Sequence, residues 1–205
     1  PVSKDNQGHI VTDGSGLVAK TEDPADESKV EAVKNALTNG SISMWVANDA
    51  EAVAAAEDGG VKALEALASG ETDAQRKQEL LQLTQMLKPM SGGRRNVQAQ
   101  MVYDSELQLR DGNGVVAELV QIPNGMRVSL AISEELYQSL QGKTLCILRG
   151  STDAAGKATA QELSATLGGS QGSRVVTFVT DRAGALLLTA YETTGGSYNG
   201  SDTVS

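Results

Sequence analysis

The side chains most often used in nucleophilic and acid–base catalysis are scarce in this chain. It contains a single histidine, His9, and a single cysteine, Cys146. A Ser-His-Asp or Cys-His site would have to recruit His9, which lies in a polar stretch where no neighbour orients it. Cys146 stands between Leu145 and Ile147 on an expected strand, without a basic neighbour to lower its pKa. We interpret His9 as a solvated or interface residue and Cys146 as a buried structural thiol.

Paired carboxylates offer a second kind of chemistry. Glu134-Glu135, and Asp104 with Glu106, could provide the acid and the base of a glycosidase. Such catalysis needs two carboxyl groups about 5–10 Å apart, a spacing that sequence alone does not establish. Chance pairs are expected in a chain with 26 acidic residues. A carbohydrate-active enzyme therefore stays open as an alternative.

The first residue, Pro1, allows one further enzymatic hypothesis. A free N-terminal proline amine can act as a general base, as in the tautomerase superfamily. Those enzymes run from the proline directly into an apolar strand, whereas Pro1 is followed here by the polar stretch VSKDNQG. The sequence departs from that pattern, and an N-terminal-proline enzyme is kept only as an alternative.

Glycine-rich segments resemble parts of ligand-binding loops without completing them. DGSG at 13–16 and DGNG at 111–114 lack the oxygen ligands and the final glutamate of an EF-hand, and are read as turns. GGSQGSR at 168–174 precedes a strand and lacks the Lys-Ser/Thr of a phosphate loop. No His/Cys cluster has zinc spacing. We expect no catalytic residues, no cofactor and no metal.

Charge and composition exclude several classes of partner. The formal net charge is −9, and Arg94-Arg95 is an isolated basic pair, so phosphate neutralisation cannot support nucleic-acid binding. The same deficit argues against anionic membranes, and no apolar run approaches the ~20 residues of a membrane helix. The chain begins without an apolar signal region, so we expect no secretion by a signal peptide, and a single cysteine is consistent with a cytosolic origin.

Hydrophobic periodicity predicts helices in the first half of the chain. Residues 24–38 show helical spacing, with Asn39-Gly40 as a stop, and 41–47 alternate like a short strand. The stretches 51–57 and 61–68 are rich in helix formers, and Gly59-Gly60 separates them. The strongest helix is expected from Thr72 or Asp73 to residue 88, where Pro89 should end it.

The second half has a two-residue period broken by turn signals. Strands are expected at 96–103, 106–110, 115–122, 126–132, 143–148, 157–167, 174–180 and 185–194. Ser133 should cap one short helical turn, and DGNG should form a hairpin. Closely spaced strands with glycine-rich turns indicate a mainly antiparallel β sandwich or small barrel.

These elements predict an α+β chain made of separable parts. We expect an extended N-terminal arm at 1–23, a helical domain at 24–90, a β-rich domain at 96–194 and a C-terminal tail at 195–205. SGGRR at 91–95 marks the change of composition, and proteolysis there should leave a folded fragment from about residue 96 onward.

The function expected from these observations is structural. The two polar ends cannot bury enough apolar surface to order themselves, so we expect neighbouring chains to hold them. The interpretation is a non-enzymatic subunit of a multi-protein assembly, of the type of a bacteriophage virion protein such as a capsid decoration, cement or tail component. Its partners would be copies of itself and other subunits, contacted through the terminal arms, and its place the virion assembled in the host cytoplasm. A soluble protein-binding adaptor is a further alternative.

Overall fold

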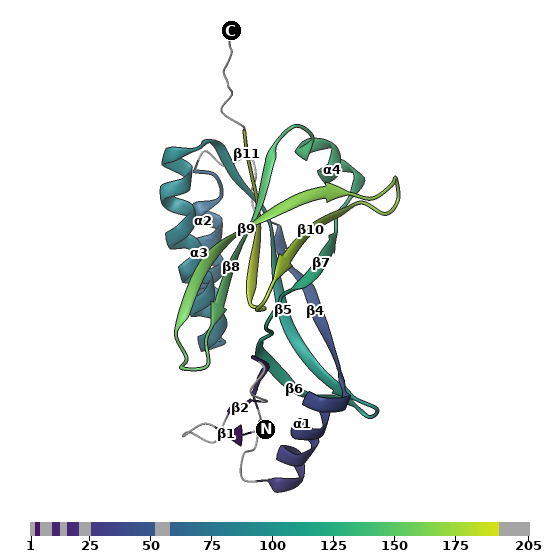
Figure 1. The fold of residues 1–205 in the computed structure, drawn as a ribbon. Coiled ribbons are helices and arrows are strands. Elements are labelled where there is room, and N and C mark those ends of the chain that lie inside the picture. The colour runs from purple at the N-terminus through teal and green to yellow at the C-terminus, as the bar shows by residue number, and fades with distance from the viewer. Residues whose placement is uncertain (1–2, 5–9, 13–15, 21–25, 52–57, 193–205) are drawn as a thin grey trace.

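The fold is α+β, with helices placed against one curled antiparallel sheet. The computed structural model describes residues 3–4, 10–12, 16–20, 26–51 and 58–192 (Figure 1). Within these ranges the helices are α1 Glu27–Asn39, α2 Val61–Gly70, α3 Ala74–Gly93 and α4 Glu134–Leu140. The strands are β1 Ser3–Lys4, β2 Ile10–Thr12, β3 Val18–Lys20, β4 Ser41–Glu51, β5 Arg95–Asp111, β6 Gly114–Gln121, β7 Met126–Ala131, β8 Thr144–Thr152, β9 Ala158–Gly168, β10 Val175–Thr180 and β11 Ala185–Glu192.

All described strand pairs are antiparallel and belong to one connected sheet. The order is β1-β2-β3-β6-β5-β11-β8-β9-β10-β7, and β4 joins the sheet only through β5. The seventeen-residue β5 pairs with β11 along its first half and with β6 along its second half. Its opposite edge pairs with β4. A single strand therefore connects every major part of the sheet.

Three layers enclose the upper part of the molecule. Helices α2 and α3 cover one face of β5, β11 and β8, and the other face is covered by β7, β10 and α4 (Figure 1). The sheet can curl in this way because β9 and β10 are paired at only three positions, after which β10 turns away with β7. The lower part has a cluster of its own, in which α1 packs on β5 and β6. Its buried members include Val33, Ala36, Leu37, Leu107, Leu109 and Leu119.

Side-chain caps define the starts of three helices. The Asp26 carboxylate accepts from the Ser28 and Lys29 amides at 3.0 and 3.4 Å, and Asp73 accepts from the Arg76 amide at 2.9 Å. Ser133 accepts from the Leu136 amide at 3.0 Å. These contacts satisfy amides that a helix leaves without an internal partner. The expected caps at Asp73 and Ser133 are confirmed.

Pro89 does not end α3, which continues to Gly93. Proline removes one intrahelical hydrogen bond and crowds the preceding turn, which destabilises a helix interior. Packing offsets this cost here, because Met90 lies in the same buried cluster as Leu83 and Leu87. The Arg94 amide then closes the helix by donating to the Met90 carbonyl at 2.9 Å.

The expected independence of the helical and β-rich parts is wrong. The change from helix to strand does occur near 91–95, but β4 forms ten register pairs with β5 across it. Helices α2 and α3 also share one hydrophobic cluster with β5, β8 and β11. A fragment starting at residue 96 would lose both the β4 pairing and the helical cover of the sheet. The sequence pattern locates elements, whereas domain independence depends on long-range pairing that no local period records.

The interpretation of residues 1–23 as an extended arm also changes in part. Strand β3 pairs with β6, and Ala19 is completely buried against the α1 cluster. Strands β1 and β2 continue from β3 as short antiparallel additions. The described pieces of this segment therefore pair within the chain. The tail at 195–205, Pro1, His9 and residues 52–57 of the helix expected at 51–57 lie outside the described residues, whereas Glu51 belongs to β4 and not to a helix.

Glycine sets the distance between α3 and the sheet. A Cβ atom on Gly150 of β8 would overlap the carbonyl oxygen of Glu79, and would lie 2.9 Å from the Glu79 carbonyl carbon. A Cβ on Gly184, which directly precedes β11, would overlap the Gly150 carbonyl. The backbones of α3, β8 and the start of β11 thus meet at a point that has no room for a side chain.

Replacing Gly150 by alanine should test this contact. The added methyl group has backbone atoms rather than flexible side chains to displace, so we expect Gly150→Ala to lower the free energy of unfolding by about 2 kcal/mol or more. The control is Gly70→Ala at the end of α2, where nothing lies within 4 Å of the added Cβ. Urea unfolding should show a change of less than about 0.5 kcal/mol for the control. Equal stabilities of the two variants would contradict the close approach.

Candidate functional site

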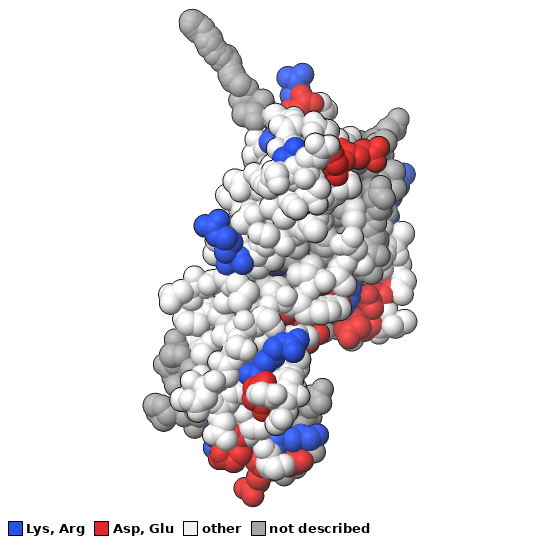
Figure 2. All heavy atoms as spheres, turned by 90° about the vertical axis from the view of Figure 1, so that its right-hand side faces the viewer, with Lys and Arg blue, Asp and Glu red and all other residues white. Residues whose placement is uncertain are grey.

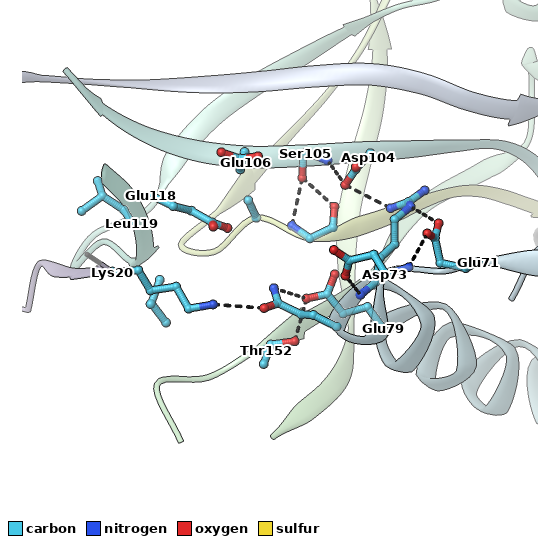
Figure 3. A pocket seen from close by; sticks show the side chains of 15 residues that line it. Lys20, Glu71, Asp73, Glu79, Asp104, Ser105, Glu106, Glu118, Leu119 and Thr152 are labelled. Carbon is cyan, nitrogen blue, oxygen red and sulfur yellow. Dashed lines mark hydrogen bonds and ion pairs between the residues drawn. The ribbon is translucent and has the colours of Figure 1, made fainter. Parts of the chain in front are cut away.

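A polar recess lies between the start of α3 and the polar face of β5 and β6 (Figure 3). Its volume is about 380 Å3. Two basic side chains, Lys20 and Arg76, line it beside a larger group of acids. These acids are Glu71, Asp73, Glu79, Asp104, Glu106 and Glu118.

Strand alternation and a helix start bring these groups together. Asp104 and Glu106 point to one face of β5, while Tyr103 and Leu107 point to the other face and are buried. Glu118 joins them from β6, where it is paired with Gln108, and Lys20 lies beside Glu118 on β3. The first two turns of α3 lie over this face and contribute Arg76 and Glu79. Four segments distant in the sequence therefore form the recess.

Arg76 connects the helix to the sheet through ion pairs. Its Nε lies 3.2 Å from Oε1 of Glu71, and its Nη1 lies 3.1 Å from Oδ1 of Asp104. Arg76 is only 8 % exposed, so its charge needs nearby carboxylates to offset the loss of hydration. Guanidinium geometry suits this role because its donors reach two acids at once. Arg76 consequently holds α3 above Asp104.

Glu79 is the carboxyl group whose protonation the fold changes most. It is 3 % exposed, and its Oε2 accepts from Thr152 Oγ1 at 2.7 Å and from Gln75 Nε2 at 3.3 Å. Burial raises the pKa of Glu79 to about 7. The hydrogen bonds from Thr152 and Gln75 and the charge of Arg76 act in the opposite direction, whereas Asp104 adds to the rise.

A second carboxyl group in the recess is perturbed in the same direction. Burial raises the pKa of Glu118, and the negative charge of Glu106 adds to this effect. Lys20 opposes the rise, and its Nζ donates to Oε1 of Gln75 at 3.0 Å. Lys20 thus links β3 to α3, and its charge falls short of neutralising the acids around it. The recess is suited to holding protons or a cationic group.

The residues singled out from the sequence lie in different parts of the structure. Asp104 and Glu106 line the recess, whereas Glu134 lies elsewhere and pairs with Arg174, with Oε1 3.0 Å from its Nε. Cys146 is 1 % exposed between the sheet and the helices, and burial raises the pKa of its thiol to about 12. The thiol is buried as expected, and its pKa disfavours the thiolate that a nucleophile requires.

The turn assigned to DGNG is confirmed by the hairpin between β5 and β6. Asp111 pairs with Gly114 across it, and its carboxylate accepts from the Asn113 amide at 2.8 Å. The loop at 168–174 is tied down by Arg174, whose Nη1 donates to the Gly169 carbonyl at 2.6 Å. Both segments therefore have a structural use. DGSG at 13–16 lies largely outside the described residues.

Sequence reasoning missed Arg76, Glu79, Glu118 and Lys20. One available signal was the position of Arg76 on α3, because it continues the buried stripe of Leu80, Leu83 and Leu87 with helical spacing. A charged residue in such a stripe needs a buried partner. Its partner Asp104 comes from a strand 28 positions further along, so the sequence could mark the residue but not the contact.

The acids of the recess do not form a metal centre. Among the residues that the structure describes, no group of three or more His, Cys, Asp or Glu is arranged to hold a metal ion. Within those ranges, none of the helices combines the length and the apolar character needed to cross a membrane. Comparison of the chain with protein-family models, with curated proteins and with solved structures finds no match. The functional argument therefore depends on the chain's own geometry.

The buried carboxyl group of Glu79 should make stability depend on pH. Its pKa is about 7 in the folded chain against 4.5 for an unperturbed glutamate, so the folded state binds this proton more tightly. Proton binding by Glu79 stabilises the folded state fully below about pH 4.5, and this stabilisation is lost as the pH rises towards 7. We expect Glu79→Gln to remove this loss and to be more stable than the parent at pH 8 by on the order of 2–3 kcal/mol.

Urea unfolding between pH 4.5 and 8 measures this effect. Glu135→Gln, which replaces an exposed carboxyl group on α4, is the matched control and should retain the slope of the parent protein. Parallel pH profiles for the parent and Glu79→Gln would show that Glu79 is not the group responsible.

Proposed function

We propose that this chain is a non-enzymatic structural subunit that joins a multi-protein assembly by strand addition at the outer edge of β4. A bacteriophage virion protein, such as a capsid decoration, cement or tail component, is one form that such a subunit takes. The observation that carries the proposal is the open edge of β4 itself. The described N-terminal strands pair within the chain, so the sheet edge replaces them as the proposed contact.

The outer edge of β4 is long and has no strand partner among the described residues. Strand β4 spans eleven residues and pairs only with β5 among the described elements. Its opposite edge leaves backbone donors and acceptors available to another strand. The average strand has about 5–6 residues, so this edge is long enough to form a full set of backbone hydrogen bonds with a partner.

Residues 41–48 of β4 lack the usual protection of an edge strand, and the charged residues of the strand, Asp49 and Glu51, follow at its C-terminal end. Natural edges are guarded by lysine, proline or inward-pointing charges, which disfavour pairing with another chain. The segment 41–48 has the sequence SISMWVAN, with no charged residue and no proline. It contains Trp45, the single tryptophan of the chain, whose side chain is 43 % exposed. An exposed tryptophan in an edge segment without charged residues or proline is typical of an interface.

The strands at the two ends of the main sheet order provide a comparison. Strand β1 has two residues, one of which is Lys4, and β7 has six residues with Arg127 exposed. Each of these strands carries a basic residue, which residues 41–48 of β4 lack. The side of the molecule on which β4, β7 and α4 lie in Figure 1 faces the viewer in Figure 2, where broad uncharged areas separate the charged side chains. This surface allows another chain to approach despite the net charge of −9.

Glu79 favours a second candidate function, a carbohydrate-active enzyme. A carboxyl group with a pKa of about 7 in a recess with other carboxylates has the properties of a general acid. Its oxygen is already hydrogen-bonded and its side chain almost wholly buried, so a glycosidic oxygen would reach it only after the recess opened. Hydrolysis of chromogenic glycosides by the parent protein, abolished in Glu79→Gln, would favour this candidate over the structural one.

Binding of an added strand tests the proposed function. The probe is a fluorescently labelled, uncharged peptide of alternating Thr and Val, followed by anisotropy. We expect saturable binding to the parent protein and at least a roughly tenfold loss in Trp45→Lys, because a lysine on the edge opposes pairing. The matched control is Val179→Lys, which alters another exposed large apolar side chain, on β10, and should bind like the parent.

A peptide with alternate backbone amides methylated separates strand addition from apolar adhesion. It retains the side chains but cannot complete the backbone hydrogen bonds, so it should not bind. Equal binding of the methylated peptide, or equal binding to Trp45→Lys, would contradict the proposed function.

A further inference from the structure

We infer that the strand received by β4 is β4 of a second copy of this chain, in an antiparallel two-fold pair centred on Trp45. The inference rests on the proposed function and names its partner. Three features of the molecule support this pairing: the residue order along the edge, the faces to which these residues point, and the charges on the neighbouring strand.

Two-fold symmetry restricts how β4 can pair with itself. In a continuous sheet, residues directly opposite one another point to the same face. When a strand pairs with its own copy, the two residues that face each other must therefore lie an even number of positions apart in the sequence. A pair centred on Trp45 satisfies this condition: Trp45 lies opposite Trp45 of the other copy, and Met44 lies opposite Val46. Ser43 lies opposite Ala47 in the same arrangement.

This register matches side chains on both faces of the sheet. Met44 and Val46 point towards the hydrophobic clusters and are half-buried at their margins, so pairing them would extend an existing apolar layer. Trp45 is opposite Glu106 within its own chain, on the polar face. A facing tryptophan would cover its exposed ring, and aromatic cross-strand pairs stabilise antiparallel sheets.

The charges on β5 are also compatible with a two-fold pair. Arg110 Nε donates to Ser43 Oγ at 3.0 Å, which places a positive group at one end of the edge. Asp104 is paired with Ala47 in the register of β4 and β5, and its ion pair with Arg76 leaves no unpaired charge of the same sign as Arg110 at the other end of the described edge. Ser43 of one copy meets Ala47 of the other, so the Arg110 end of each chain faces the Asp104 end of its neighbour. No charged side chain of 41–48 is placed opposite a like charge, because the segment has none.

Cysteine cross-linking tests this register with Trp45 retained. In Ser43→Cys/Ala47→Cys, the two new thiols lie four positions apart on one strand, about 13 Å, which is too far for a disulfide within a chain. Across the proposed pair, each residue 43 lies opposite residue 47 of the other copy. Mild oxidation should therefore give a covalent dimer. Native Cys146 is buried and remains unchanged.

The single variants are the matched controls. Ser43→Cys alone and Ala47→Cys alone should stay largely uncross-linked, because each thiol would face an unmodified residue. An equimolar mixture of the two should cross-link through the mixed pair. Cross-linking of either single variant as efficient as that of the double variant would overturn the register.

Light scattering separates this inference from the proposed function. We expect the parent protein and Val179→Lys to show a concentration-dependent dimer mass, and Trp45→Lys to remain monomeric over the same range. A parent protein that is monomeric at millimolar concentration, yet binds the labelled strand peptide, would overturn the second copy as partner and leave strand addition intact. Failure of both measurements would overturn both proposals.

Discussion

The length of β5 is the constraint on which the rest of this structure depends. Its first half pairs with β11 under the helices α2 and α3, and its second half pairs with β6 over α1. Its outer edge holds β4 along almost the whole length of that strand. Side chains of β5 enter all three hydrophobic clusters. The helices and the sheet are therefore one cooperative unit, because the burial of each cluster requires the same strand to be in place.

The acidic recess follows from this arrangement. The polar face of β5 extends beyond the area that the helices cover. The first turn of α3 lies over Asp104. Carboxylates of the strand and of the helix are thereby placed around Arg76, while Glu79 is held in the contact between α3 and β8. The raised pKa of Glu79 is a cost of this close packing. We regard the recess as part of the support of the fold, and the sheet edge as the functional surface.

Local sequence signals were sufficient to locate most elements. Alternation marked the strands from residue 96 onward, although it divided β5 into two strands at 96–103 and 106–110. DGNG marked the hairpin, and Ser133 marked the start of α4. These signals work because turn chemistry and side-chain alternation act within a few residues. Pro89 was misread because its local cost is offset by the distant packing of Met90. The same limit applies to domain independence and to the recess, which arise from contacts between β4 and β5 or between Arg76 and Asp104.

The proposed function depends on two features of β4, the absence of charge in residues 41–48 and the position of the strand at an edge of the sheet. The absence of charge in 41–48 can be read from the sequence, but only the pairing order shows that β4 is an edge. Had β4 been an inner strand, the same residues would have needed no protection and Trp45 would carry no functional meaning. The central claim is therefore that the outer backbone groups of β4 are used for pairing with another chain.

Amide hydrogen exchange in β4, followed as a function of protein concentration, tests this claim most directly. The inner amides of β4 should exchange slowly at every concentration, because they pair with β5. The alternate, outward-facing amides of 41–48 should exchange rapidly in dilute solution and become protected as the concentration rises. The amides of β7, an edge strand with the exposed charged residue Arg127, should show no such dependence on protein concentration. Outward amides of β4 that stay unprotected up to millimolar concentration, with or without an added strand peptide, would contradict the account.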